Sequence, residues 1–328
     1  MCRYAAKARL DSPSRSGERG RDILNPEIKT LLGPVLVLLA IGTSVVSVGI
    51  VRIGNPLLHI ANRWLRWVLI AMLFALLLHK PDWTGQSRSI PALFAIAFLA
   101  WFLLETMFNW AKISTFSRSG YPLFPRYTHN HDGDEWPVHQ AAIQVKEWLS
   151  ANGFTKVQSL KFGASETFTL RTTFYQDAEG FCRIQIHFLP PNPSGRTMFY
   201  AISNIMEEGT RFTTDNISMP FAIFVPENWE MQRKPLILSL PNLLALHGQR
   251  VEASGKTPVR WDVDPMDDLE QQRRRLERVN LDHGFLHSSD NHEEYGRLTS
   301  EGRYRMWKEM WLLSYLGRPL SPRPSKQD

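Results

Sequence analysis

Three long apolar stretches fill the first third of the chain. Leu31 to Val51 contains 21 residues without a charge, residues 57–79 carry charges only near their start, and residues 90–110 carry only Glu105. At about 1.5 Å of rise per residue, a helix of this length matches a hydrocarbon layer of about 30 Å. These stretches are apolar on every face, whereas a soluble surface helix keeps a polar face. We therefore predict three transmembrane helices at about 31–51, 57–79 and 90–110.

Two charges at matching depths predict an ion pair. Glu105 lies near the end of the third stretch, and Arg66 lies near the start of the second, so both face the same side of the membrane. A carboxylate buried at this depth requires a partner. We expect Glu105 to face Arg66 or Arg63; the alternative is an interfacial carboxylate that reaches water alone.

After residue 135 the pattern changes to alternation of apolar and polar positions. Alternating side chains occur at Phe168, Leu170, Thr172 and Phe174, at Cys182, Ile184, Ile186 and Phe188, and at Met198, Tyr200 and Ile202. Such alternation is typical of half-buried strands, and the short turns between them favour antiparallel neighbours. We predict a meander of five or six strands between Lys156 and Leu240, with 220–225 and 235–240 as short edge strands.

Helical patterns frame this sheet. We expect helices at 135–152, 243–252, from Asp264-Pro265 onward, and at 299–316, where Gly317 and Pro319 end the pattern. The predicted fold class is three transmembrane helices followed by an α+β domain, an antiparallel meander covered by helices. The expected divisions are a disordered tail at 1–27, a membrane region at 28–111, a linker at 112–135, a soluble domain at 136–318 and a disordered tail at 319–328. We expect the soluble domain to fold without the membrane helices.

The net charge of +6 belongs to the membrane region. Residues 1–111 carry 12 Lys and Arg against 6 Asp and Glu, while residues 112–328 carry 26 of each kind. A neutral soluble domain lacks the charge that a nucleic-acid backbone requires, so we predict no nucleic-acid partner. The predicted partners are the bilayer and anionic lipid head groups near residues 1–126. With one cysteine in the soluble domain, Cys182, no disulfide framework is expected.

The basic residues also indicate sidedness. Six of them must share one side of the membrane: Arg52, Arg63, Arg66, Lys112, Arg118 and Arg126. Six others stand on the opposite side: Arg15, Arg19, Arg21, Lys29, Lys80 and Arg88. Without the N-terminal tail the balance becomes six to three, which places the soluble domain in the cytoplasm.

Two histidine groups are the candidates for metal or acid–base chemistry. His129 and His131 precede Asp132 and Asp134 in the linker. His283 and His287, four residues apart, are followed by a second group of ionisable residues, His292, Glu293 and Glu294. Imidazoles and carboxylates suit several divalent ions. The alternatives are a solvated linker in the first case and a helix-end or surface histidine in the second.

The last helix carries an unusually wide apolar arc. Trp307 and Trp311 lie beside it, with Arg303 and Arg305 at its flank. We expect one tryptophan to pack on strand residues such as Phe168, Ile184 or Tyr200; the alternative is contact of these four residues with lipid head groups.

The sequence contains no complete catalytic or cofactor-binding motif among the patterns considered. The Gly255-Lys256-Thr257 run has the wrong spacing from the preceding glycine for a phosphate loop, and the serine-hydrolase, zinc-protease and dinucleotide-binding patterns are missing from the sequence. We predict no cofactor. The favoured function is a membrane-anchored, non-catalytic interaction, sensing or structural module with an unspecified protein partner. The alternatives are a membrane-bound enzyme that uses one histidine group and a peripheral lipid-contacting domain.

Overall fold

The computed structural model describes residues 26–53, 55–79, 89–119, 122–132, 136–165, 168–189, 197–288, 295–321 and 323–324. The predicted N-terminal tail lies almost entirely outside the described residues, as do Asp134, His292, Glu293, Glu294 and, in the predicted C-terminal tail, residues 322 and 325–328.

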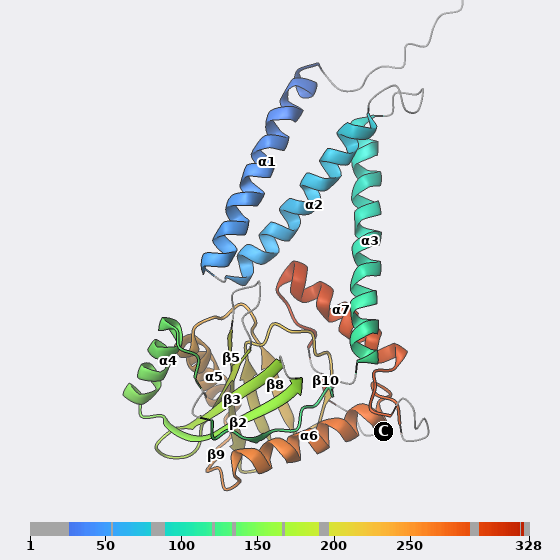
Figure 1. Cartoon of the computed structure of the whole chain (residues 1–328). Coiled ribbons are helices and arrows are strands. Elements are labelled where there is room, and N and C mark those ends of the chain that lie inside the picture. The colour runs from blue at the N-terminus through green and yellow to red at the C-terminus, as the bar shows by residue number, and fades with distance from the viewer. Residues whose placement is uncertain are drawn as a thin grey trace, which may run out of the picture.

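Three long apolar helices open the chain: α1 (Pro26–Ile53), α2 (Pro56–Leu78) and α3 (Ile90–Arg118). By length and composition each could cross a membrane, with mean hydropathies of 2.1, 1.6 and 1.9 over the apolar windows. Asn55 caps α2 by accepting the N–H of Leu57 at 2.9 Å. Helix α3 continues past residue 111, so the first part of the predicted linker is helical. Its last turns reach into the α+β part of the molecule (Figure 1).

The eight-stranded sheet is mostly antiparallel. Its strands are β1 (Thr128–His129), β2 (Thr155–Ser165), β3 (Phe168–Gln176), β4 (Arg183–Phe188), β5 (Met198–Met206), β6 (Arg211–Asp215), β8 (Trp229–Arg233) and β9 (Pro258–Val259). Strands β2 to β6 form the predicted meander, each antiparallel to the next.

The sheet edge differs from the prediction. Strand β8 pairs with β6 in parallel, so the sheet is mixed. The predicted edge strand at 220–225 leaves this sheet; its end, β7 (Phe224–Val225), pairs instead with β10 (Arg323–Pro324). Residues 235–239 form no strand. A parallel neighbour requires a crossover connection, here residues 216–228, and short-range alternation does not reveal such a pairing.

Among the described residues, the α+β part contains four helices: α4 (Gln140–Ala151), α5 (Leu240–Ser254), α6 (Pro265–Asp282) and α7 (Ser300–Leu316). Helix α4 starts later than predicted, because the His139 ring nitrogen Nδ1 caps it by accepting the Ala142 N–H at 3.1 Å. Helix α6 begins at the predicted place, where Asp264 accepts the Met266 N–H at 2.9 Å. Helix α7 ends at Gly317, whose φ of 63° is left-handed and suits glycine.

The buried apolar residues form two main groups. The first, the sheet core, includes Leu149 of α4, Ile184 and Tyr200 of the sheet, and Leu240 and Leu243 of α5. The second, the junction core, joins α3, β7, β8 and α7 and includes Ile113, Val225, Trp229, Phe285 and Met306. The prediction that the last helix covers the Ile184–Tyr200 face is therefore wrong. Helices α4 and α5 cover that face, and α7 packs elsewhere.

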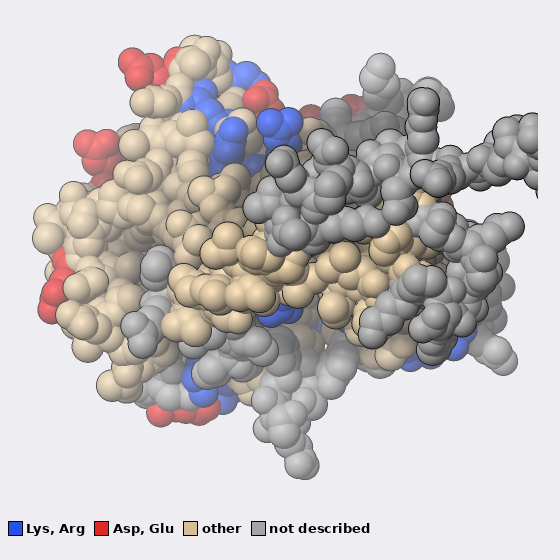
Figure 2. All heavy atoms as spheres, turned by 90° about the horizontal axis from the view of Figure 1, so that it is seen from above, with Lys and Arg blue, Asp and Glu red and all other residues tan. Residues whose placement is uncertain are grey.

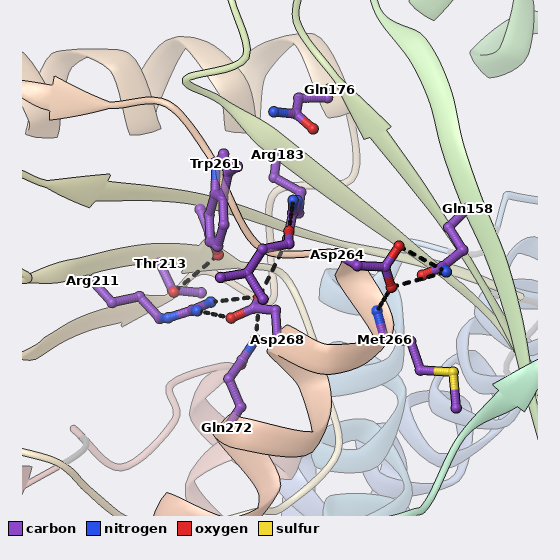
Figure 3. Close-up of polar contacts among 12 residues, drawn as sticks. Gln158, Gln176, Arg183, Arg211, Thr213, Trp261, Asp264, Met266, Asp268 and Gln272 are labelled. Atoms are coloured by element: carbon purple, nitrogen blue, oxygen red, sulfur yellow. Dashed lines mark hydrogen bonds and ion pairs between the residues drawn. The ribbon is translucent and has the colours of Figure 1, made fainter.

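A buried ion cluster fixes α6 to the sheet (Figure 3). Asp268, in the first turn of α6, is 5% exposed and accepts from Arg211 of β6 and from Gln272 of the following helical turn. Arg183 of β4 lies 3.5 Å from the same carboxylate and above the Trp261 ring at 4.0 Å. Because the carboxylate and both guanidinium groups are almost fully buried, this cluster holds the helix against the strands.

Candidate functional site

Helix α7 lies between the apolar helices and the sheet (Figure 1). It runs antiparallel to α3: Trp311 near its end contacts Phe102 with ring centroids 5.3 Å apart, while Leu298, just before its start, accepts the Ser117 hydroxyl at 3.3 Å. The two helices therefore meet near both ends of α7. We call the meeting point of α2, α3 and α7 the junction site; it consists of Arg63, Trp64, Trp67, Phe102, Glu105, Trp311 and Tyr315.

A carboxylate occupies the centre of the junction site. Glu105 accepts from Arg63 Nη1 at 3.2 Å and from the Trp67 indole N–H at 2.7 Å, and its side chain is only 16% exposed. The structure thus contains the ion pair between Glu105 and Arg63 that matching depths predicted. Arg66 has a different contact, because its Nη2 donates to the Ser47 hydroxyl at 3.4 Å.

Aromatic rings enclose this ion pair. The Tyr315 ring stacks on Trp311 with centroids 4.5 Å apart and meets Trp67 edge-on at 5.1 Å. Arg63 lies over the Tyr315 ring at 5.1 Å, a cation–π geometry. The Trp64 indole donates to the Tyr315 carbonyl at 3.1 Å. The end of α7 is therefore attached to α2 by polar and aromatic contacts together.

A second carboxylate attaches the middle of α7 to the sheet domain. Glu309 is completely buried and accepts four bonds: from the N–H groups of Phe221 and Ala222 at 2.5 Å each, from Arg233 Nη1 at 2.6 Å, and from the Leu320 N–H at 3.1 Å. Ala222 has a left-handed φ of 41°. Successive N–H groups around such a residue form an anion-binding concavity, which here holds the Glu309 carboxylate.

Arg233 also faces a third carboxylate. Its Nε lies 3.6 Å from Asp215 Oδ1, and Asp215 is fully buried. Burial raises the pKa of Asp215 to about 6, although Arg233 opposes the rise. One guanidinium group between two buried carboxylates favours retention of a proton by the pair.

The structure does not assemble the first histidine group into a site. His129 and His131 are exposed and stack on each other with centroids 5.6 Å apart at the β1 edge. Asp132 pairs instead with Lys161, whose hydrogen bond lowers the pKa of that carboxyl.

The second histidine group is also dispersed. Helix α6 ends at Asp282, so His283 and His287 do not share a helical face. The His283 ring lies against Phe224 at 4.7 Å and its Nδ1 is 2.9 Å from the Val279 carbonyl oxygen. Among the residues that the structure describes, no group of three histidine, cysteine or acidic side chains could hold a metal ion.

The flank of the last helix contributes to the interior of the molecule. Arg305 donates to the Ala222 carbonyl at 3.0 Å and lies over the Phe224 ring at 4.0 Å. Trp307 packs against the junction core, and Trp311 contacts Phe102 and Tyr315 rather than the strand residues named above. Arg303 is half-buried.

Sequence reasoning missed one buried histidine. His247 of α5 lies between the Thr214 hydroxyl at 2.8 Å and the Asn204 amide oxygen at 2.7 Å, beside a cavity of about 410 Å³ that Cys182 also lines. Burial lowers the pKa of His247 to about 4 and raises that of Cys182 to about 12. Both groups are thus neutral at pH 7, and both imidazole nitrogens are engaged. No local motif marks this histidine, because its partners come from distant strands.

Asn216-Ile217-Ser218 has the pattern of an N-glycosylation site, but its asparagine is part of the interior. The Asn216 amide nitrogen donates to the Ile237 carbonyl at 2.9 Å, and its oxygen accepts the Tyr200 N–H at 2.8 Å. With no exposed surface, this side chain is inaccessible to glycosylation in the folded domain.

No protein-family model matches the chain, and no curated protein or solved structure is similar to it.

Proposed function

We propose that this chain is a multi-pass membrane protein whose α+β domain is held directly against the bilayer and serves as a non-catalytic interaction, sensing or structural module. The observation that carries the proposal is the double attachment of α7. Glu309 binds the sheet domain through Arg233, while Tyr315 and Trp311 contact α2 and α3. A helix fixed at both sides transmits displacement of one part to the other, since packed interfaces shift between discrete arrangements.

The proposed location of the domain is the cytoplasm. The basic residues that flank the domain-side ends of the apolar helices outnumber those at the opposite ends once the N-terminal tail is set aside. Cytoplasmic loops carry such an excess of Lys and Arg. The bilayer and its anionic head groups are the proposed partners of this region.

Two measurements test the proposal. A reporter fused to the C-terminus, active only in the cytoplasm, should be active in cells, and alkaline extraction should leave the chain in the membrane pellet. Activity only of an exported reporter contradicts the proposed sidedness, and release into the supernatant contradicts membrane spanning.

Coupling through α7 is tested by hydrogen exchange of the full chain in detergent. Tyr315→Ala removes the ring that contacts α2, and we expect amide protection of α7 to fall by about tenfold or more, because aromatic contacts contribute about 1 kcal/mol each. Tyr304→Ala is the matched control, since Tyr304 lies in the same helix but is exposed. Equal exchange in the two variants rules out the coupling.

A further inference from the structure

A groove lies beside the point where α7 meets α2. Its volume is about 840 Å³, and it is formed by β8, residues 234–237 and the chain that follows α7. A Cβ on Gly317 would lie 2.9 Å from side-chain carbons of both Ile60 of α2 and Leu236. Since Gly317 and Leu236 line the groove, one end of the groove abuts the first turns of α2. This size is ordinary for a small-molecule site.

Charge is distributed unevenly along the groove. The acidic lining residues, Glu227 and Glu230, lie just before and at the start of β8. Glu230 pairs with Lys256 at 3.4 Å, and the lining residue Arg250 donates to the Glu230 carbonyl at 3.3 Å. Lys234 and Arg318 lie at the end near α2 and form no ion pair with any described residue. Because a strand advances about 3.3 Å per residue, roughly 13 Å separate Glu230 from Lys234. The end next to α2 therefore presents two cations that no carboxylate in the described part of the chain neutralises.

Apolar side chains surround the same end. Leu236 lines the groove and is 39% exposed. Leu316, which directly precedes the lining residue Gly317, is 55% exposed, and Leu238, which follows the lining residue Ile237, is 37% exposed. Seen from above, where the apolar helices lie nearest the viewer, the described atoms across the centre of the view are mainly uncharged, and most acidic atoms lie near the outline (Figure 2). A soluble anion makes no use of exposed leucines, whereas a lipid requires an apolar path for its chains.

We propose that this groove binds the phosphodiester head group of an anionic phospholipid. The phosphate lies between Lys234 and Arg318, and the acyl chains leave past Leu236 and Leu316 along α2. Two cations near one phosphate, with apolar side chains below them, match the charge and the amphipathic character of this ligand. The inference rests on the membrane placement proposed above and extends it, because it assigns a lipid to residues of the α+β domain far from the basic N-terminal region.

Native mass spectrometry of the delipidated full chain in a nonionic detergent tests the site. Dioleoyl phosphatidylglycerol and dioleoyl phosphatidylcholine differ in head-group charge and share their acyl chains. We expect the wild-type chain to bind the anionic lipid about 25-fold more tightly, since each of the two basic contacts near a membrane surface contributes about fivefold. Equal binding of the two lipids overturns the proposal without recourse to any variant.

Matched variants locate the preference. The double variant Lys234→Gln with Arg318→Gln should reduce the preference for phosphatidylglycerol over phosphatidylcholine to less than about threefold. Lys146→Gln with Arg275→Gln removes the same charge from exposed positions outside the groove and should retain it. The exchange Lys234→Arg with Arg318→Lys preserves both charges and should also retain it. An unchanged preference in the first double variant, measured on chains with wild-type thermal stability, places the lipid elsewhere and refutes the site.

Competition separates a lipid site from a general anion site. Inorganic phosphate and glycerophosphoglycerol carry the charge without the acyl chains, and neither should displace the lipid at equal concentration. Displacement by either one identifies a soluble anion as the ligand. A chain that stays in the membrane after alkaline extraction but shows no preference for the anionic lipid refutes this inference alone, and a chain that is extracted refutes the proposed function.

Discussion

The substitution Glu309→Gln tests how α7 is attached to the sheet domain. The carboxylate is completely buried, and each of its oxygens faces two donors: the Phe221 and Ala222 N–H groups on one side, and Arg233 and the Leu320 N–H on the other. Glutamine has the same shape but replaces one oxygen by an NH₂ group, which only donates. Whichever way the amide is oriented, two donors face another donor.

The expected loss follows from this count. A hydrogen bond to a charged group is worth about 1.5–3 kcal/mol, so two lost bonds give roughly 3–6 kcal/mol. Asp215, at 3.6 Å from Arg233 Nε, still offers the guanidinium a partner and reduces the penalty for an unpaired buried cation. We therefore expect the opening free energy of the domain to fall by about 3–5 kcal/mol.

Hydrogen exchange of the full chain in detergent measures this quantity at β6 and β8, where opening requires the domain to unfold. Glu301→Gln is the matched control, because Glu301 lies in the first turn of the same helix and is exposed. We expect the control to change the opening free energy by less than about 1 kcal/mol. If Glu309→Gln is as mild as Glu301→Gln, the buried carboxylate does not hold α7 to the domain and the reasoning fails.

Three further substitutions have defined outcomes. Burial raises the pKa of Asp215 to about 6, so the stability gained from its protonation is complete below the unfolded pKa and is lost as pH rises through 6. Asp215→Asn should therefore remove about 3 kcal/mol of the pH dependence of the unfolding free energy, measured by urea unfolding between pH 4 and 7. Glu105→Gln should increase proteolysis at the junction site in the full chain, whereas Arg66→Gln, which loses only an exposed contact, should leave the cleavage pattern unchanged. Gly317→Ala introduces a Cβ 2.9 Å from Ile60 at a left-handed φ and should lower the melting temperature by several degrees; a wild-type melting curve contradicts the packing described here.

Local sequence signals predicted the elements that depend on neighbouring residues. The apolar stretches marked α1 to α3, and the alternation marked the meander. Asp264-Pro265 marked the start of α6, and Gly317 marked the end of α7. In each case the decisive interaction lies within a few residues of the element itself. Helix α4 was placed too early because its cap is a histidine, a residue type that capping statistics do not favour.

Pairings between segments far apart in the chain could not be predicted from the sequence. The parallel register of β8 on β6 depends on a crossover whose course no local pattern encodes. Likewise, the apolar arc of α7 indicated that the helix is covered without indicating by what, and its actual partners, Phe102 and Trp67, lie more than two hundred residues away.

The contacts of the candidate site likewise include one that the sequence predicted and one that it did not. The pairing of Glu105 with Arg63 was predictable, because a lone charge in an apolar stretch requires a partner at its own depth. The bond from Arg233 to Glu309 was not, because both residues belong to segments rich in other charges, where nothing distinguishes a buried carboxylate from a solvated one.

The junction core also changes what an excised domain should do. The expectation that the domain folds alone stays a prediction, and it applies most directly to the sheet core, which α4 and α5 cover. A fragment beginning at residue 130 lacks Ile113 and Phe124 of the junction core and the α2 and α3 rings that contact Tyr315 and Trp311. Exposure of such an aromatic face favours aggregation. We therefore expect fragment 130–320 to retain its sheet and the Glu309 attachment while both ends of α7 exchange freely, and fragment 107–320 to protect the start of α7 but not its end. If the Tyr315 amide is fully protected from exchange in either fragment, the apolar helices do not determine the position of the end of α7. The proposed coupling between the two halves of the molecule would then have no structural basis.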